Sequence, residues 1–234
     1  VYLSTNNGAN WHQTSLNFGG VRSFAISGNN IFAGMYDDPS GPGGVQLSTN
    51  NGTNWSLTSL NFGIILSLSA SGNNIYAGVD YSPYSGVYIS TNNGANWTLT
   101  TSFASPSFLA SSGNNVYMGN GTDIYLSTNN GTNWGQTALY HGPYYSLAVS
   151  GNKIYVGSDY HGLFLSINNG ISWSNIGFYG YNVKALAVSG NNVIAFKQWH
   201  FDSGVYYSAN SGTTWTQSTF NNKYINCFSL SGSN

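Results

Sequence analysis

The sequence is poor in charged residues. Only 5% of its 234 residues are charged, and five lysines and arginines face six acidic residues for a net charge of −1. So few cations cannot neutralise the several phosphates that nucleic-acid binding requires, and no basic cluster is present to hold an anionic membrane. Nucleic acid and membrane surfaces are therefore excluded as partners.

Cysteine and long apolar runs are also scarce. The single cysteine, Cys227, excludes an internal disulfide framework, and its place in an apolar stretch predicts a buried thiol. No run of about 18 apolar residues occurs, and neither end carries a charged segment followed by an apolar one. We expect no membrane span, and a chain that is already processed or excerpted from a longer protein. Abundant Asn, Ser, Thr and Gly favour an exported protein.

What the sequence does contain is one octapeptide in six copies. It reads STNNGANW at 4–11, recurs almost unchanged at 48–55, 90–97 and 127–134, and returns as SINNGISW at 166–173 and SANSGTTW at 208–215. A period near 40 residues is typical of a repeat architecture. The six tryptophans that end the copies are Trp11, Trp55, Trp97, Trp134, Trp173 and Trp215.

Each repeat predicts four antiparallel strands and no helix. A short alternating strand precedes the octapeptide and a polar strand follows it, while a second pair surrounds a Gly-Asn turn, as in SFAISGNNIFAG at 23–34. Four-stranded repeats of this length predict an all-β fold, a single six-bladed β-propeller over residues 1–234, with repeats starting near 1, 45, 87, 124, 163 and 205. The chain starts at the third strand of a blade and stops after a first strand, so N- and C-terminal strands are expected to close the ring in one blade.

The first strand of the Gly-Asn hairpin alternates bulky and small residues. Because successive side chains point to opposite faces of a strand, bulky faces are expected to pack on small faces of the next blade. The bulky positions are Phe24, Leu68, Leu109, Leu147, Leu186 and Phe228, and the small ones are Ser23, Ser67, Ser146, Ala185 and Cys227.

The octapeptide resembles the Asp-box, or bacterial neuraminidase repeat, of sialidase-like propellers. In that family an Asp stands where this chain has Asn, for example at Asn6, and Asn keeps a short side chain that can cap a turn but lacks the charge. We interpret the copies as structural turns rather than binding pockets, since a Gly at positive φ and a packed Trp already explain them. The residues assigned to this structural role are Ser4, Asn6, Gly8 and the six tryptophans.

Recognition is predicted in the segments that differ between copies. All six acidic residues fall in the loops between second and third strands, among aromatic residues, and the residue opening each first strand also differs. Aromatic faces beside carboxylates and amides suit sugars. The candidate ligand-binding residues are Arg22, Tyr36, Asp37, Asp80, Tyr81, Asp123, Tyr145, Asp159, His161, Lys184, Trp199, His200 and Asp202.

The content of ionisable residues limits the chemistry. With one Arg and no Glu, the chain lacks the three arginines and the Tyr–Glu pair that the sialidase resemblance would imply, so sialidase activity is rejected. Aspartates on neighbouring loops could still act as a glycosidase pair, with Asp80, Asp123, Asp159 and Asp202 as candidates. The histidines lack metal-ligand spacing, so no metal or other cofactor is predicted.

We therefore predict a non-enzymatic, lectin-like module that binds a glycan or another small polar ligand. Two alternatives remain open, a glycoside hydrolase and a structural or adhesive module of a larger surface protein. The expected location is extracellular or on a bacterial cell surface.

Overall fold

The structure is a computed structural model that describes residues 1–36, 43–139, 142–199, 202–221 and 225–229. This part of the chain contains 22 strands and no helix, so the predicted all-β class is confirmed. Two compact units are distinguished, unit 1 comprising Val1–Asn120 and Ser127–Trp134, and unit 2 comprising Gly121–Leu126 and Gly135–Asn234.

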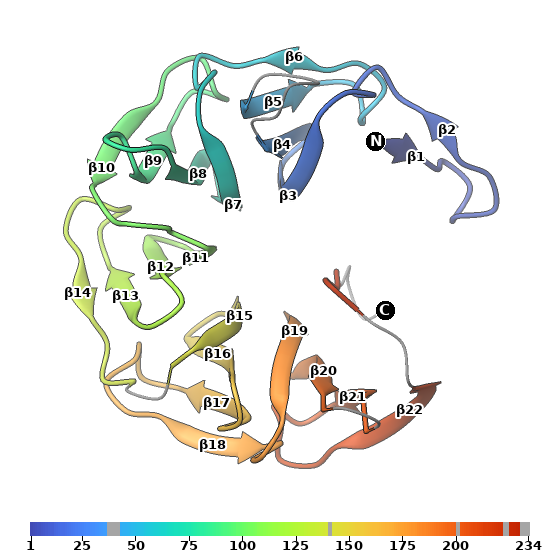
Figure 1. Ribbon diagram of the computed structural model, residues 1–234, viewed down its shortest axis with the longest axis vertical. Helices are drawn as coiled ribbons and strands as arrows, with labels where there is room; N and C mark the ends of the chain where they lie inside the picture. Colours follow the sequence, from blue (N-terminus) through green and yellow to red (C-terminus); the bar gives the residue numbers. More distant parts are fainter. Residues whose placement is uncertain (37–42, 140–141, 200–201, 222–224, 230–234) are drawn as a thin grey trace. The chain divides into compact units, whose positions relative to one another are not determined.

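Unit 1 begins with a two-stranded sheet and continues with two four-stranded antiparallel sheets (Figure 1). The first sheet pairs β1 (Tyr2–Leu3) with β2 (His12–Gln13). The second contains, in order, β3 (Gly20–Ser27), β4 (Asn30–Tyr36), β5 (Gly44–Ser48) and β6 (Ser56–Leu57). The third contains β7 (Ile64–Ser71), β8 (Asn74–Asp80), β9 (Gly86–Ser90) and β10 (Thr98–Thr101).

The next strands along the chain form two antiparallel pairs. β11 (Phe108–Ser112) pairs with β12 (Asn115–Gly119) in unit 1, and β13 (Ile124–Ser127) pairs with β14 (Gly135–Gln136). Unit 2 holds the last two sheets. One contains β15 (Tyr144–Ser150), β16 (Lys153–Ser158), β17 (Leu163–Ser166) and β18 (Ser174–Gly177), and the other contains β19 (Asn182–Ser189), β20 (Asn192–Gln198), β21 (Gly204–Ser208) and β22 (Thr216–Asn221).

The six octapeptides form six turns with one hydrogen-bond pattern. In the second copy, Ser48 Oγ accepts from Gly52 N at 2.9 Å and donates to Asn50 Oδ1 at 3.0 Å, while Asn50 Oδ1 accepts from Asn54 N at 2.8 Å. The residue before the glycine and the glycine itself both have positive φ, 57° at Asn51 and 83° at Gly52. Asn and Gly tolerate this left-handed region best, which explains why the Asn-Gly dipeptide recurs.

The tryptophans close these turns with some variation. Trp55 Nε1 donates to Gly52 O at 2.8 Å, and the first, fourth and fifth copies repeat this bond. Trp215 instead donates to Ile176 O on β18, 3.0 Å away, which joins the last two sheets of unit 2. The turn atoms are thus engaged in holding the backbone.

Adjacent sheets approach closely where serine and glycine face each other. Ser67 Oγ donates to Pro106 O and Ser146 Oγ donates to Val183 O, both at 2.9 Å, so each serine reaches the backbone of the following sheet. Their cross-strand partners are Gly78 and Gly157, and a Cβ on either glycine would overlap that same backbone. These small residues therefore set the spacing between sheets.

Apolar residues from neighbouring sheets form the core of each unit. In unit 1, Phe32, Ile65 and Ile75 belong to one fully buried cluster that includes residues of the second and third sheets. In unit 2, Tyr155, Val183 and Ala195 form a similar cluster between the last two sheets. The packing of sheet faces is the source of most of the stability of such a fold.

Two expectations differ at the ends of the chain, and a third is not tested there. The bulky residue Phe24 is 50% exposed, unlike its buried counterparts Leu68 and Leu109, because no sheet of unit 1 covers that face of β3 in the described residues. The prediction of a buried Cys227 is wrong, because the thiol is exposed. Residues 225–229, which include Cys227, form no strand and therefore do not pack into a sheet. The rest of the predicted closing strand lies outside the described residues, so ring closure stays a prediction.

Candidate functional site

A β-bulge recurs at the start of four first strands. The register shifts between Val21 and Ser23, and shifts in the same way in β7, β15 and β19. The residue inside each bulge has no cross-strand partner, and such a bulge re-aims its side chain. The four residues so placed are Arg22, Leu66, Tyr145 and Lys184, three of which are candidate ligand-binding residues.

The described aspartates lie in or beside the loops between second and third strands, as the sequence predicts. Asp80 ends β8, Asp123 precedes β13, Asp159 follows β16, and Asp202 lies between β20 and β21. The candidates Asp37 and His200 lie outside the described residues.

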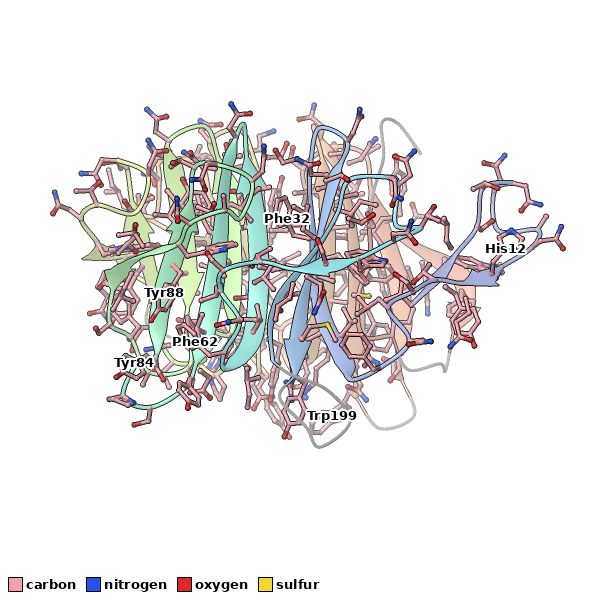
Figure 2. All side chains as sticks on the ribbon, turned by 90° about the horizontal axis from the view of Figure 1, so that it is seen from above. His12, Phe32, Phe62, Tyr84, Tyr88 and Trp199 are labelled. Atoms are coloured by element: carbon pink, nitrogen blue, oxygen red, sulfur yellow. The ribbon has the colours of Figure 1, made fainter. Side chains whose placement is uncertain are left out.

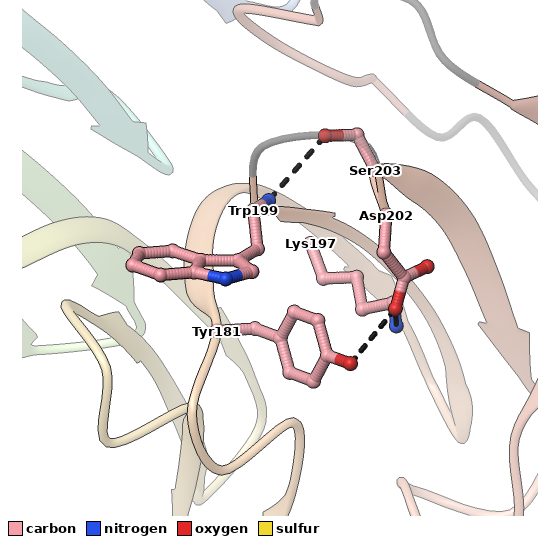
Figure 3. Close-up of polar contacts among 5 residues, drawn as sticks. All are labelled: Tyr181, Lys197, Trp199, Asp202 and Ser203. Atoms are coloured by element: carbon pink, nitrogen blue, oxygen red, sulfur yellow. Dashed lines mark hydrogen bonds and ion pairs between the residues drawn. The ribbon is translucent and has the colours of Figure 1, made fainter.

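A buried lysine occupies the centre of a cluster in unit 2. The Lys197 side chain is 8% exposed, and its Nζ donates to Asp202 Oδ2 at 2.9 Å. The Tyr181 hydroxyl donates to the same oxygen at 2.8 Å, and Lys197 Nζ lies 3.8 Å from the Tyr181 ring centre (Figure 3). The Tyr206 ring centre is 5.1 Å from Lys197 Nζ. The ammonium is therefore stabilised by one carboxylate and two aromatic faces.

The pKa values of the pair move apart. Burial lowers the pKa of Lys197, but hydrogen bonds to Asp202 and Tyr206 outweigh burial and raise the pKa above its ordinary value. The hydrogen bonds from Lys197 and then from Tyr181 hold the pKa of Asp202 below its ordinary value. Both groups are charged at neutral pH. A glycosidase general acid needs a raised pKa, so Asp202 is not suited to that role.

A second group in unit 2 has the same three residue types. Lys184 Nζ lies 3.4 Å from the centre of the Tyr145 ring. Burial, followed by the negative charge and a hydrogen bond of Asp159, raises the pKa of the Tyr145 hydroxyl. Each group thus has a lysine on a tyrosine face and an aspartate at the tyrosine hydroxyl, which places ionic and apolar surface side by side.

An aromatic pair joins the loops of this cluster. The Tyr160 and Trp199 rings meet edge to face with centroids 4.6 Å apart. Tyr160 N donates to Asn182 Oδ1 at 3.2 Å, and Gly180 N donates to Tyr160 O at 2.6 Å. Trp199 O accepts from Asp202 N at 2.7 Å. The loops after β16, before β19 and after β20 are therefore held together by direct contacts.

His161 lies at the edge of the same cluster. Its Nδ1 is 2.9 Å from Asp159 O, and its ring is 6.4 Å from that of Tyr179, which is 76% exposed. Among the described residues there is no group of three or more His, Cys, Asp or Glu side chains placed to hold a metal ion.

The other candidates make separate contacts. In unit 1 the Arg22 guanidinium lies 4.8 Å from the centre of the Tyr36 ring. In unit 2, Asp123 accepts from Gln136 Nε2 at 2.7 Å, across its own sheet. Also in unit 1, Asp80 ends β8 and Tyr81 begins the loop to β9. The structure thus groups six candidates in unit 2: Tyr145, Asp159, His161, Lys184, Trp199 and Asp202.

Sequence reasoning missed Lys197 and did not select Tyr181 or Tyr206. One signal was available, because Lys197 stands where the first two copies have the buried residues Met35 and Val79. A lysine at an otherwise apolar strand position indicates a paired charge.

The ion pair gives a first testable prediction. We expect Asp202→Asn to lower the free energy of unfolding at pH 7 by about 1–2 kcal/mol, because Lys197 then stays buried without its anion. This value allows for solvent screening, since the Asp202 side chain is 53% exposed. The measurement is thermal or urea unfolding of both proteins between pH 3 and 11, with Asp123→Asn as the control.

The pH dependence follows from the directions of the pKa shifts. Because the folded pKa of Asp202 is lowered, its contribution is present above the ordinary Asp pKa of about 4 and is lost as the pH falls through the lowered value. Because the folded pKa of Lys197 is raised, its contribution is present below about 10.5 and is lost above it. A stability difference that stays constant across both limits would contradict this assignment.

Four-stranded antiparallel sheets, each built from four consecutive strands, follow one another along the chain. This arrangement defines the protein as a β-propeller. The structural neighbours support the fold. A GH74 xyloglucanase from Xanthomonas campestris matches with a TM-score of 0.73 and 16% identity over 92% of this chain, and a GH74 enzyme from Niastella koreensis with 0.63 and 19% over 84%. YCF48 bound to a D1 peptide matches with 0.65 and 16% over 91% of this chain and 72% of its own.

These likenesses establish the fold alone. This chain spans 41% and 31% of the two GH74 chains. No protein-family model and no curated protein matches the sequence. Within the described residues, no helix is long and apolar enough to cross a membrane.

Proposed function

We propose that the chain is a non-enzymatic carbohydrate-binding module. Its principal binding site is the group of polar and aromatic residues around Lys197, Asp202 and Trp199, called here the cluster of unit 2. One observation carries this proposal. The Tyr160–Trp199 aromatic pair lies beside the Lys197–Asp202 ion pair, because Asp202 N donates to Trp199 O. Sugars present apolar C–H faces that stack on aromatic rings and hydroxyls that bond carboxylates and amides.

The half-exposed Asp202 supports this role. Only its Oδ2 is hydrogen-bonded among the described residues, so Oδ1 is available to a ligand hydroxyl. Lys197 and Tyr181 hold the carboxylate in place before a ligand arrives, which reduces the entropic cost of binding. Lys184 adds an ammonium group that makes no ion pair within the described residues.

We also propose that the octapeptide is a variant of the Asp-box turn. The bonds received by Asn50 Oδ1 are bonds that an aspartate oxygen in the same place could accept, which supports the resemblance. An exported or cell-surface location is proposed from the low charge and the abundance of small polar residues.

The test is a binding panel with the full chain. The chain is first applied to an array of neutral and acidic oligosaccharides, and the bound sugars are then studied by calorimetry and by an assay for new reducing ends. We expect saturable binding of one sugar class and no cleavage. Release of reducing ends would support the alternative of a glycoside hydrolase and overturn the non-enzymatic proposal. The absence of binding across the panel would overturn carbohydrate recognition and favour a structural or adhesive module.

A further inference from the structure

A second aromatic surface lies in unit 1, on the loop between β8 and β9. Tyr81 and Tyr84 are 44% and 56% exposed, yet their rings stack with centroids 6.3 Å apart and planes 15° from parallel. The Phe62 ring contacts both tyrosines, with its centroid 5.7 Å from that of the Tyr81 ring and 6.3 Å from that of the Tyr84 ring. Two exposed rings in a stacked arrangement form an extended apolar surface.

The backbone below these rings is held by several contacts. Tyr88 Oη donates to Tyr84 O at 3.0 Å, and its ring lies 5.9 Å from Phe62. Figure 2 shows Phe62, Tyr84 and Tyr88 together at one end of the sheet. Tyr81 N donates to Ser85 Oγ at 2.8 Å. The rings are thus positioned in advance, which favours binding of a ligand that stacks on them.

A groove of about 360 Å³ is formed by the same loop, within the size range of small-molecule sites. One group of lining residues comes from this loop and the other from the segment between β10 and β11. The lining residues are Asp80, Ser82, Pro83, Ser85, Ser102, Phe103 and Ala104, so Tyr81 and Tyr84 belong to the same loop as the groove but do not line it.

The groove has a distinct polar character. Ser85 Oγ donates to Asp80 Oδ1 at 3.3 Å, so the carboxylate is oriented by its own loop. None of the lining residues is a cation, so a carboxylate-bearing ligand would meet an unfavourable charge. A neutral ligand rich in hydroxyl donors suits Asp80 and the serines. A proline-rich peptide fits less well, because its carbonyl groups cannot donate to a carboxylate.

We propose that this groove and the Tyr81–Tyr84 pair form a second saccharide-binding site, separate from the cluster of unit 2 and selective for neutral oligosaccharides. The proposal shares its ligand class with the proposed function, but it depends on a different set of residues. The chain would then carry two sites for one type of glycan.

The experiment isolates the second site in the full chain carrying Trp199→Ala, which removes the main aromatic contact of unit 2. Calorimetry uses cellohexaose, xylohexaose and mannohexaose, with hexagalacturonate and a proline-rich peptide as competitors of other chemistry. We expect at least one neutral hexasaccharide to bind with one-to-one stoichiometry. Adding Tyr84→Ala should weaken this binding at least tenfold, whereas Tyr2→Ala, at another exposed tyrosine, should change it less than twofold.

The outcomes distinguish this proposal from the proposed function. If Trp199→Ala alone abolishes all sugar binding, the second site is refuted and the cluster of unit 2 stands. If Tyr84→Ala abolishes binding that Trp199→Ala leaves intact, a second site at the Tyr81–Tyr84 pair is supported. Equal binding of hexagalacturonate, or preference for the peptide, overturns the assigned ligand class. The melting temperature of each variant checks that it is folded. We expect Tyr84→Ala to change the melting temperature little, because the Tyr84 side chain is 56% exposed.

Discussion

Gly157→Ala is expected to lower the free energy of unfolding by about 3 kcal/mol, with a fall in melting temperature of about 6–12 °C. A Cβ on Gly157 would overlap both Ser146 Oγ and Val183 O, and would lie 2.9 Å from Val183 Cβ. Relief requires the last two sheets of unit 2 to separate, which also weakens the hydrogen bond from Ser146 to Val183. The steric overlap and the weakened hydrogen bond both destabilise the variant, because Gly157 and Ser146 lie at the same contact between the two sheets.

A matched control is available at Gly135, where an added Cβ meets nothing within 4 Å and φ is not in the left-handed region. Gly135→Ala should change the free energy of unfolding by less than about 0.5 kcal/mol. Urea unfolding of the two variants beside the parent checks both values. Equal stability of Gly157→Ala and the parent would show that the sheets are not held at the spacing described.

Trp199→Ala is expected to weaken binding at the unit 2 site about 30-fold, which corresponds to about 2 kcal/mol. The indole forms the edge-to-face pair with Tyr160, so its loss removes a stacking surface and also releases Tyr160. Because Trp199 lies in the loop after β20 and is only partly buried, the melting temperature should fall by only a few degrees. Calorimetry with the sugar selected by the panel measures the loss.

Trp11→Ala provides the comparison for this experiment. Trp11 is 62% exposed and belongs to an octapeptide turn, where its Nε1 donates to Gly8 O. We expect unchanged sugar affinity, because the turn tryptophans hold backbone and do not belong to the site. A loss of affinity as large as that of Trp199→Ala would place recognition in the repeated turns.

The repeats made the fold predictable. A fixed octapeptide encodes a local turn, since Ser48 and Asn50 bond atoms at most four residues away, and local bonds are legible in sequence. The alternation of large and small residues likewise anticipated the close contact of sheets at Ser67 and Ser146. These features depend on spacing along the chain, which the sequence states directly.

The site was less predictable because its contacts join residues far apart in sequence. Lys197 was missed although its partner Asp202 is only five residues away. The aromatic rings that surround its ammonium come from distant positions, Tyr181 just before β19 and Tyr206 on β21. Burial of Cys227 was wrongly expected for the related reason that an apolar stretch is buried only where another segment covers it.

The central claim is that the variable loops, and not the repeated turns, recognise the ligand. Hydrogen–deuterium exchange of the full chain, with and without a saturating concentration of the selected oligosaccharide, tests it most directly. The account predicts slower exchange in peptides that contain Tyr160, Asn182 and Trp199, with no change in the octapeptide turns. Protection confined to the turns, with the loops unaffected, would contradict it.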